Sequence, residues 1–163
     1  MRILGIDPGY ATVGYGIIEN DNGKFRPLDY GAVETPAKLA TPERLVLIEQ
    51  GITELVKSVE PDEIAVEELF FNTNITTGIK VAQARGVILL ACTKLCAKLY
   101  EYTPLQIKST VTGNGTASKT QVQFMVRSLL RLKETPKPDD AADALAAALC
   151  HALSAQGVKR GLK

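Results

Sequence analysis

The sequence predicts a single domain of the mixed α/β class. Short apolar runs bounded by turn residues, such as Ile64-Ala-Val66, are typical of strands inside a sheet. Longer segments whose apolar residues recur three and four positions apart, such as the one after Thr41-Pro42, are typical of helices packed on a core. Three strands come first, strands and helices then alternate, and helices end the chain. That order predicts helices layered on a sheet in one domain, which we place at residues 1–155.

Four strands and one helix are expected in the first half of the chain. The predicted strands are Arg2–Asp7, Val13–Glu19, Phe25–Val33 and Glu63–Glu67. A polar turn at residues 20–23 joins the second strand to the third. Thr41 and Pro42 are expected to supply the N-cap and a first-turn proline of a helix that runs until Pro61. Its apolar residues with helical spacing are Leu45, Leu47, Ile48, Ile52, Leu55, Val56 and Val59.

One more strand and four helices are expected in the second half. The segment Leu69–Thr77 shows no clear period and many hydroxyl and amide side chains, so it is predicted to be a loop beside the site. The predicted strand is Tyr100–Thr103, and the predicted helices are Gly78–Leu99, Pro104–Thr112, Ala117–Arg131 and Asp139–Ala155. Thr116 is expected to cap the third of these helices. Residues 156–163 are expected to form a frayed basic tail.

Composition places the chain among ordinary globular proteins. Its 163 residues are 45% hydrophobic and 23% charged, enough for one substantial core. The longest strongly apolar stretch, Val87–Cys92, is far shorter than the ~20 residues that a membrane span needs. The first strand begins at Arg2 and the three cysteines form no disulfide framework, so a cytoplasmic protein is expected. A zinc site built from Cys92, Cys96, Cys150 and His151 is not favoured, because neither a second paired motif nor a loop presents these ligands.

Charge is unevenly distributed along the chain, although the net charge is only +1. Residues 1–77 contain 6 Lys and Arg against 13 Asp and Glu, whereas residues 78–163 contain 13 against 5. Such an uneven distribution of charge suits an enzyme that contacts a phosphate backbone with its basic half. Solvated faces that happen to differ in charge are the simpler alternative.

Four carboxylates form the pattern that is most informative about function. Asp7 ends the first predicted strand just before a Pro-Gly turn, and Glu67 ends the fourth. Asp140 and Asp143 are three residues apart at the start of a predicted helix, a spacing that places both on one face. Acids this close together repel unless a cation neutralises them, and Mg²⁺ prefers such oxygen ligands. Two such ions about 4 Å apart can activate water and stabilise the leaving oxygen of a phosphate ester.

Each of these acids also has a simpler interpretation. Asp-Pro-Gly is a common turn, a strand can end in solvated acids, and acids favour helix N-termini. Asp139 is interpreted as a first-turn residue, because it lies about 100° around the helix from Asp140. Glu68 is the competing candidate for the role of Glu67. We favour Glu67 because it directly follows the apolar run.

A glycine-rich segment offers a rival interpretation. Gly113–Thr120 resembles the phosphate-binding pattern G-x-x-x-x-G-K-[ST], with Ser118 where the second glycine belongs. That pattern requires a buried strand before the loop, and Gln106–Thr112 is weak as a strand. A nucleotide-binding enzyme is therefore the less favoured alternative. We interpret the loop as leading into a helix that carries Lys119 toward a phosphate backbone.

Motifs along nearly the whole chain resemble those of the RuvC family of Holliday-junction resolvases. In order they are Ile6-Asp-Pro-Gly9, Gly14-Tyr-Gly16, Val66-Glu67 with Phe70, Gln83-Ala-Arg-Gly86, Gln106-Ile-Lys108, Ser118-Lys119 and Asp140-Ala-Ala-Asp-Ala-Leu145. The resemblance implies a ribonuclease H-like fold, with a five-stranded mixed sheet flanked by helices and the first and fourth strands side by side. It also implies a homodimeric endonuclease that cleaves four-way DNA junctions in recombination and repair. The implied cofactor is Mg²⁺, two ions per active site, with Mn²⁺ as a substitute.

The resemblance also assigns roles to individual residues. Those that match the family's metal-binding carboxylates are Asp7, Glu67, Asp140 and Asp143. Phe70, three residues after Glu67, matches an aromatic wedge that disrupts base stacking at the crossover. Lys108 and Lys119 match basic positions that contact or polarise the scissile backbone, and Lys119 would support the charge that develops there. Solvated helix ends are the simpler interpretation of both lysines.

Dimerisation is expected to involve the helix Gly78–Leu99, because its apolar residues face more than one side. The small residues Ala82 and Gly86 would permit a close approach on that helix. A two-fold dimer presents two sites to two strands, which predicts paired nicks. Whether a branch-migration motor docks on the protein is left open. A junction-binding protein without nuclease activity is the remaining alternative, although none of the four acids is missing.

Overall fold

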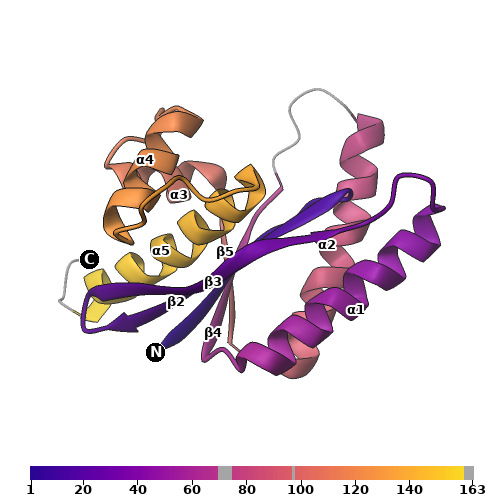
Figure 1. Cartoon of the computed structure of the whole chain (residues 1–163), viewed down its shortest axis with the longest axis horizontal. Coiled ribbons are helices and arrows are strands. Elements are labelled where there is room, and N and C mark those ends of the chain that lie inside the picture. Colours follow the sequence, from indigo (N-terminus) through magenta and orange to yellow (C-terminus); the bar gives the residue numbers. More distant parts are fainter. Residues whose placement is uncertain (70–74, 97, 160–163) are drawn as a thin grey trace.

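Five strands and five helices make up the part of the chain that the computed structural model describes, which comprises residues 1–69, 75–96 and 98–159 (Figure 1). The strands are β1 (Arg2–Asp7), β2 (Thr12–Asp21), β3 (Lys24–Glu34), β4 (Glu63–Glu67) and β5 (Leu99–Tyr102). The helices are α1 (Thr41–Val59), α2 (Ile75–Leu95), α3 (Pro104–Thr112), α4 (Lys119–Leu129) and α5 (Asp139–Lys159). Every element that the sequence predicted is present, in the expected order.

The strands form one mixed sheet in the order β3-β2-β1-β4-β5. β1 pairs antiparallel with β2 and parallel with β4, so the expected adjacency of the first and fourth strands is confirmed. In the β1–β4 pair, Ile6 lies opposite Val66. Both strands end one residue later, at Asp7 and Glu67. The two acids therefore leave the sheet at the same edge.

Helices cover both faces of the sheet, and each layer encloses its own hydrophobic core. α1 and α2 cover one face, and α3, α4 and α5 cover the other (Figure 1). The helix α5 is the most enclosed: from Ala141 to Ala152 every residue except Asp143 is buried. A helix that is buried on all sides serves as core. Asp143 is therefore a carboxylate carried by a core helix.

Two glycines let α5 lie unusually close to the sheet. A Cβ atom on Gly5 of β1 would overlap the carbonyl oxygen of Ala144, and one on Gly14 of β2 would overlap the carbonyl oxygen of Asp140. Any side chain at these positions would therefore push the backbone of α5 outward. The glycines set how near the start of α5 comes to the ends of the strands.

We expect Gly5→Ala to lower the free energy of unfolding by at least about 3 kcal/mol, since the new methyl group meets backbone rather than a movable side chain. That loss corresponds to a fall in melting temperature of roughly 6 to 12 °C. Thermal unfolding followed by circular dichroism measures it. Val46→Ile is the control, because it adds one methyl group to an exposed side chain of α1. A melting temperature that does not fall in Gly5→Ala would contradict the close packing of α5.

Two of the expected helix caps are wrong by one or two residues. The N-cap of α1 is Ala40 rather than Thr41, and its N–H donates to Glu43 Oε2 at 2.8 Å. The N-cap of α4 is Ser118 rather than Thr116. Ser118 Oγ accepts from the Gln121 N–H at 3.3 Å, and Gln121 Oε1 accepts from the Ser118 N–H at 2.7 Å. Reciprocal bonding of this kind is a capping box, which Thr116 does not form.

Two long helices also differ in extent from the expectation. α2 begins at Ile75, three residues before Gly78, because the threonines of the expected loop form its first turn. It ends at Leu95, so that the chain can turn into β5, which begins at Leu99. α5 continues to Lys159, four residues beyond the expected end, since no proline interrupts it.

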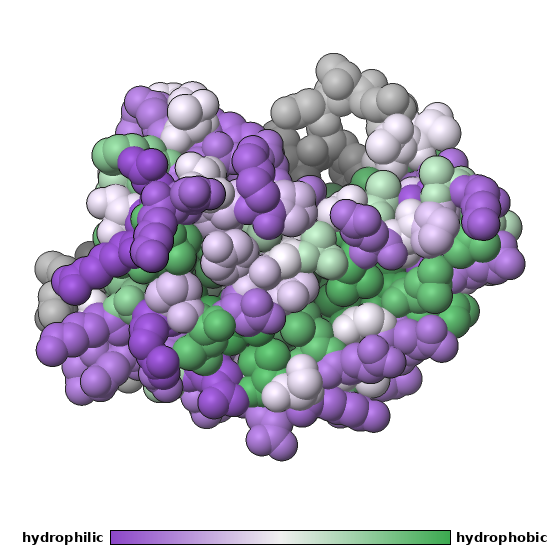
Figure 2. All heavy atoms as spheres, in the orientation of Figure 1, coloured by the Kyte–Doolittle hydropathy of each residue, from purple (hydrophilic) through white to green (hydrophobic). Residues whose placement is uncertain are grey.

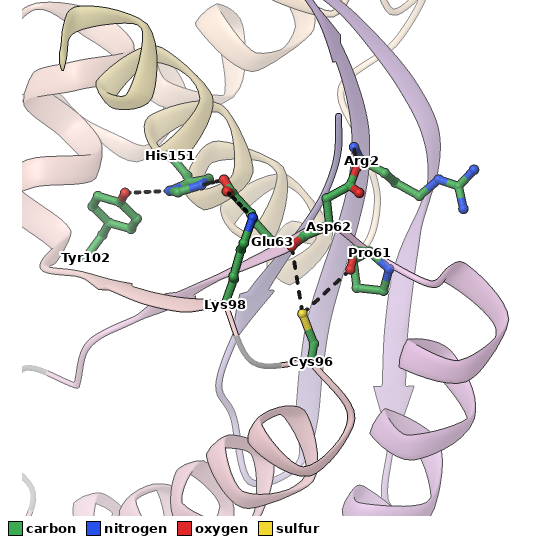
Figure 3. A network of polar contacts seen from close by, with 8 residues as sticks. All are labelled: Arg2, Pro61, Asp62, Glu63, Cys96, Lys98, Tyr102 and His151. Atoms are coloured by element: carbon green, nitrogen blue, oxygen red, sulfur yellow. Dashed lines mark hydrogen bonds and ion pairs between the residues drawn. The ribbon is translucent and has the colours of Figure 1, made fainter. Parts of the chain in front are cut away.

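His151 anchors α5 to β4 and β5 through Glu63 and Tyr102 (Figure 3). Its Nε2 lies 2.6 Å from Glu63 Oε2, and its Nδ1 lies 2.6 Å from the hydroxyl oxygen of Tyr102. The side chain is buried. Because both ring nitrogens already have protein partners, a zinc site at this histidine is not supported.

The surface is mostly polar on the face that Figure 2 shows, with hydrophilic residues over the α4 side and hydrophobic residues along the middle and toward α1. On α2, the large apolar side chains of Ile79, Leu90 and Leu95 are exposed. Grouped apolar residues on one helix commonly mark a contact surface.

Across residues 1–69, 75–96 and 98–159, none of the helices has the length and apolar character needed to span a membrane.

Candidate active site

Two carboxylates end adjacent strands at one edge of the sheet. Pro8, which follows Asp7, has no N–H to extend the ladder, and β1 ends there. Glu67 ends β4 in the equivalent position. Immediately after it, the N–H of Glu68 donates to the carbonyl oxygen of Tyr102 at 2.8 Å. The sheet therefore fixes the backbone of β1 as far as Asp7 and the backbone of β4 as far as Glu67.

The start of α5 brings the other two acids to the same edge. Asp140 lies in the first turn of the helix, and its carbonyl oxygen lies directly against Gly14. Gly14 pairs with Asp7 in the β1–β2 ladder. Asp143 follows three residues later on the same helix face. Three elements, β1, β4 and α5, thus supply the four acids that the sequence singled out.

Two hollows open beside these acids, with volumes of about 660 Å³ and about 310 Å³. Both are lined by Asp7, Glu67, Pro104 and Lys108. Lys119 and Asp143 line the smaller hollow. Asp140 lines neither of these two hollows.

Burial, together with the charges of neighbouring acids, raises several carboxyl pKa values. Burial, followed by the charges of Glu67, Asp143 and Asp140, raises the pKa of Asp7 from 3.8 to about 8. Burial and the charge of Asp143 raise the pKa of Glu67 from 4.5 to about 7. Burial also raises the pKa of Asp143, although Lys119 opposes it. A group of acids whose pKa values are raised together beside a hollow is a candidate functional site.

Lys119 supplies the one positive charge that contacts these acids directly within the described ranges. Its Nζ lies 2.9 Å from Asp143 Oδ2 and 3.8 Å from Asp139 Oδ2. Partial burial lowers its pKa, but the hydrogen bond and charge of Asp143 outweigh that effect and raise it. Asp139 is bonded more closely to Lys137, at 2.7 Å. Lys119 is therefore held on Asp143, at the rim of the smaller hollow.

The carboxylates suit a hard cation, but they do not enclose one by themselves. Among the residues that the structure describes, no three His, Cys, Asp or Glu side chains are grouped tightly enough to form a metal cage. Mg²⁺ is commonly held by one or two carboxylates together with water and substrate phosphate. Asp7 and Glu67, which repel each other beside an open hollow, fit that mode of binding.

The glycine-rich segment before Lys119 is not a phosphate-binding loop. The residues that precede Gly113 form the helix α3, whereas that motif requires a buried strand in their place. Ser118, at the position of the second glycine, is the N-cap of α4. The nucleotide-binding interpretation is therefore excluded.

The structure distinguishes Glu67 from Glu68 by position. Glu67 lines both hollows, whereas Glu68 lines the larger one and a separate hollow next to Leu69, Ala82 and Arg85. The pKa of Glu67 is raised by burial and by Asp143. Phe70, the expected wedge, lies outside the described residues, so its role remains a prediction.

A buried arginine next to the site was not anticipated from the sequence. Arg44 donates from Nε to Thr35 Oγ1 at 2.8 Å, and its guanidinium carbon lies 4.0 Å from the centre of the Tyr10 ring. Tyr10 belongs to the turn that follows Asp7, so Arg44 holds that turn against α1. The signal was present in the sequence, because Arg44 precedes the buried Ile48 by four residues and shares its helix face.

A second arginine contacts the other strand end. Arg85 of α2 forms an ion pair with Glu101 of β5, and its Nε donates to the carbonyl oxygen of Glu67 at 3.5 Å. Arg85 belongs to the motif Gln83-Ala-Arg-Gly86, to which the sequence assigned no role. Its partner Glu101 is distant in the sequence, so spacing alone does not reveal the contact.

Comparison with known proteins identifies the family. A family model described as "Crossover junction endodeoxyribonuclease RuvC" matches residues 3–151. The chain belongs to this family. A RuvC relative from Clostridioides difficile (strain 630), named crossover junction endodeoxyribonuclease RuvC, is 60% identical over 154 residues, which cover 94% of this chain and 91% of the relative.

Solved RuvC structures share the fold. A structure of Thermus thermophilus RuvC is 38% identical with a TM-score of 0.86, and covers 96% of each chain. Another, of T. thermophilus RuvC in complex with a Holliday junction substrate, is 36% identical with a TM-score of 0.89, and covers 99% of this chain and 97% of that one. The ribonuclease H-like fold expected from the sequence is thereby confirmed.

Proposed function

We propose that this RuvC family protein is an endonuclease that resolves four-way DNA junctions by symmetric paired nicks. The observation that carries the proposal is the meeting of Asp7, Glu67 and Asp143 with Lys108 and Lys119 around one pair of hollows. Acids that can hold cations lie beside lysines that can contact phosphate, as phosphodiester hydrolysis requires. The T. thermophilus relative solved with a Holliday junction supports junction DNA as the substrate.

The four carboxylates are proposed to hold Mg²⁺, or Mn²⁺ in its place. Two such ions, when bound, would supply an activated water and stabilise the leaving oxygen. Asp7 and Glu67 project from strand ends whose backbone is fixed by the sheet. Asp143 and Asp140 project from a helix that packs closely on β1 and β2. The protein's own contribution is to keep these acids in place despite their mutual repulsion.

The two lysines are proposed to bind the DNA backbone on either side of the acids. Lys108 of α3 lines both hollows, and Lys119 of α4 lines the smaller one. Because Lys119 is held by Asp143 at 2.9 Å, its charge lies near the position where negative charge would develop on the phosphate. The proposal assigns Lys119 to catalysis and Lys108 to backbone contact.

A cleavage assay tests the proposed function. The protein is incubated with a synthetic mobile four-way junction and Mg²⁺, and the labelled strands are resolved on a denaturing gel. We expect nicks at symmetric positions in two opposite strands, and none when EDTA replaces Mg²⁺. Tight junction binding without any nick would instead support a junction-binding protein that lacks nuclease activity.

We also propose that the protein is a homodimer that associates through the outer face of α2. The exposed fractions of Ile79 and Leu90 are both 55%, and Ala82 and Gly86 between them are exposed as well. Nothing in the described chain lies within 4 Å of a Cβ placed on Gly86. A stripe that combines apolar and small residues would let a second copy of α2 approach closely.

We expect Ala82→Glu to shift the protein from dimer to monomer, because a charge would be buried at the centre of that contact. Sedimentation velocity at several concentrations measures the change. Glu54→Gln on α1 is the control, since Glu54 is an exposed residue on another helix. If Ala82→Glu sediments as a dimer like the wild type, the interface lies elsewhere on the molecule.

A further inference from the structure

We propose that Arg85 is a positioning residue for the carboxylate of Glu67, which it keeps in place by tying the end of β4 to helix α2 and strand β5. The inference rests on the proposed function, because it concerns how one of the catalytic acids is held. It gives a role to the arginine of the motif Gln83-Ala-Arg-Gly86, which the cleavage chemistry leaves unexplained.

One guanidinium group contacts two neighbouring strands at the same level of the sheet. Arg85 reaches from α2, and 19% of its side chain is exposed. Its Nη2 pairs with the carboxylate of Glu101 on β5, and its Nε donates to the carbonyl oxygen of Glu67 on β4 at 3.5 Å. Glu101 lies opposite Val66, the residue before Glu67, in the β4–β5 ladder. Arg85 therefore links β4 to β5 at the end of their paired region.

On its β1 side the end of β4 is paired with a central strand, but on its β5 side it is paired with a short edge strand. β5 is an edge strand of only four residues, Leu99–Tyr102. The last backbone hydrogen bond between the strands joins the Glu68 N–H to the Tyr102 carbonyl oxygen at 2.8 Å. Strand ends with so few bonds open locally at low cost. A side chain that bridges both strands at this point would reduce that opening.

The chemistry of the position favours arginine. A guanidinium fork can bond to two acceptors in fixed directions, whereas a lysine ammonium is a single point charge. The ion pair with Glu101 adds little to global stability, because 40% of the Glu101 side chain is exposed. The expected contribution of Arg85 is therefore local order at Glu67 rather than stability of the whole domain.

The same helix also carries the proposed dimer contact. Arg85 lies between Ala82 and Gly86 in the sequence of α2, and Ala82 shares a hollow with Arg85 and Glu68. A displacement of α2 would therefore reach the Glu67 backbone through a single side chain. Displacements of about 1 Å in a catalytic group can reduce a rate roughly 10²-fold.

Amide hydrogen exchange in Arg85→Gln, measured by NMR without metal or DNA, tests the local role. We expect the Glu68 amide to exchange at least about 10-fold faster than in the wild type. The Ile64 amide is the internal control, because it donates to the Lys98 carbonyl oxygen at 2.9 Å at the other end of the same strand pair. Its rate is expected to stay within about twofold. Equal acceleration of both amides, or of neither, would overturn the proposal.

Cleavage kinetics test the consequence for the reaction. We expect Arg85→Gln to lower the single-turnover cleavage rate roughly 10- to 100-fold, with the junction Kd within about twofold. Arg85→Lys and Glu101→Gln are expected to fall between Arg85→Gln and the wild type. Arg26→Gln is the matched control, since it removes an exposed arginine pair with Glu19 on other strands. A wild-type rate in Arg85→Gln would overturn the proposal.

The two experiments separate this inference from the proposed function. If the wild-type protein does not cleave a junction, the proposed function fails, but hydrogen exchange still decides whether Arg85 holds the end of β4. If the wild type cleaves and Arg85→Gln changes neither exchange nor rate, the inference fails and the proposed function stands.

Discussion

Replacing Asp7 with asparagine is expected to slow junction cleavage by at least roughly 10³-fold while leaving junction binding close to that of the wild type. The amide is nearly the same size as the carboxylate but carries no charge, so it holds a divalent cation poorly. Asp7 lines both hollows beside Glu67, and burial, followed by the charges of Glu67, Asp143 and Asp140, raises its pKa. Single-turnover cleavage in Mg²⁺ and gel-shift titration in EDTA measure the two effects separately.

The control for this variant is Asp21→Asn, which makes the same chemical change at an exposed residue at the end of β2. It is expected to cleave at the wild-type rate. If Asp7→Asn loses junction binding as completely as cleavage, Asp7 would be a DNA contact or a structural residue rather than a metal ligand.

The same assay separates the two adjacent glutamates of β4. Glu67→Gln is expected to be inactive, whereas Glu68→Gln is expected to retain most of its activity, because Glu67 lines both hollows and interacts with Asp143. If Glu68→Gln were inactive and Glu67→Gln active, the catalytic glutamate would be Glu68 rather than Glu67. Both variants keep the length of the side chain, so a difference between them reports on charge at a known position.

Much of this architecture was predictable because it depends on patterns that are local in the sequence. The apolar runs that end at Asp7 and Glu67 identify two buried strands, and the structure places those strands side by side. The pair Asp140 and Asp143 was predictable as one helix face from its spacing alone. The close packing of α5 on the sheet is also indicated by a local feature of the sequence, because Gly5 and Gly14 interrupt otherwise apolar strands.

The features that escaped prediction depend on contacts between distant segments. Arg85 and Glu101 pair only because α2 and β5 lie next to each other in space. Nothing local in the sequence indicates that Asp140 lines neither hollow. The raised pKa of Asp7, likewise, follows from burial and from charges contributed by β4 and α5. Local spacing identifies the acids, but only packing fixes how they share the site.

Asp7→Asn is also expected to make the metal-free protein more stable at pH 8, by up to about 5 kcal/mol. In the wild type, the pKa of Asp7 is raised from 3.8 to about 8, chiefly by burial and then by Glu67. Between about pH 4 and pH 8 the folded state therefore keeps a proton that the unfolded state has released. The free energy of unfolding falls as pH rises through that window, by at most about 1.4 kcal/mol per pH unit. Asparagine does not titrate, so the variant avoids this loss.

The melting temperatures of the two proteins in EDTA at pH 4 and pH 8 test this expectation. We expect them to differ little at pH 4, where the Asp7 carboxyl group is protonated in the folded state and only about half ionised in the unfolded state, and to differ by up to about 20 °C at pH 8. Added Mg²⁺ should raise the melting temperature of the wild type more than that of the variant, because a bound cation stabilises only a site that holds it. A variant that is less stable than the wild type at pH 8 would show that Asp7 is not destabilised by its neighbours. The repulsion among the acids would then not be the force that draws a cation into this site.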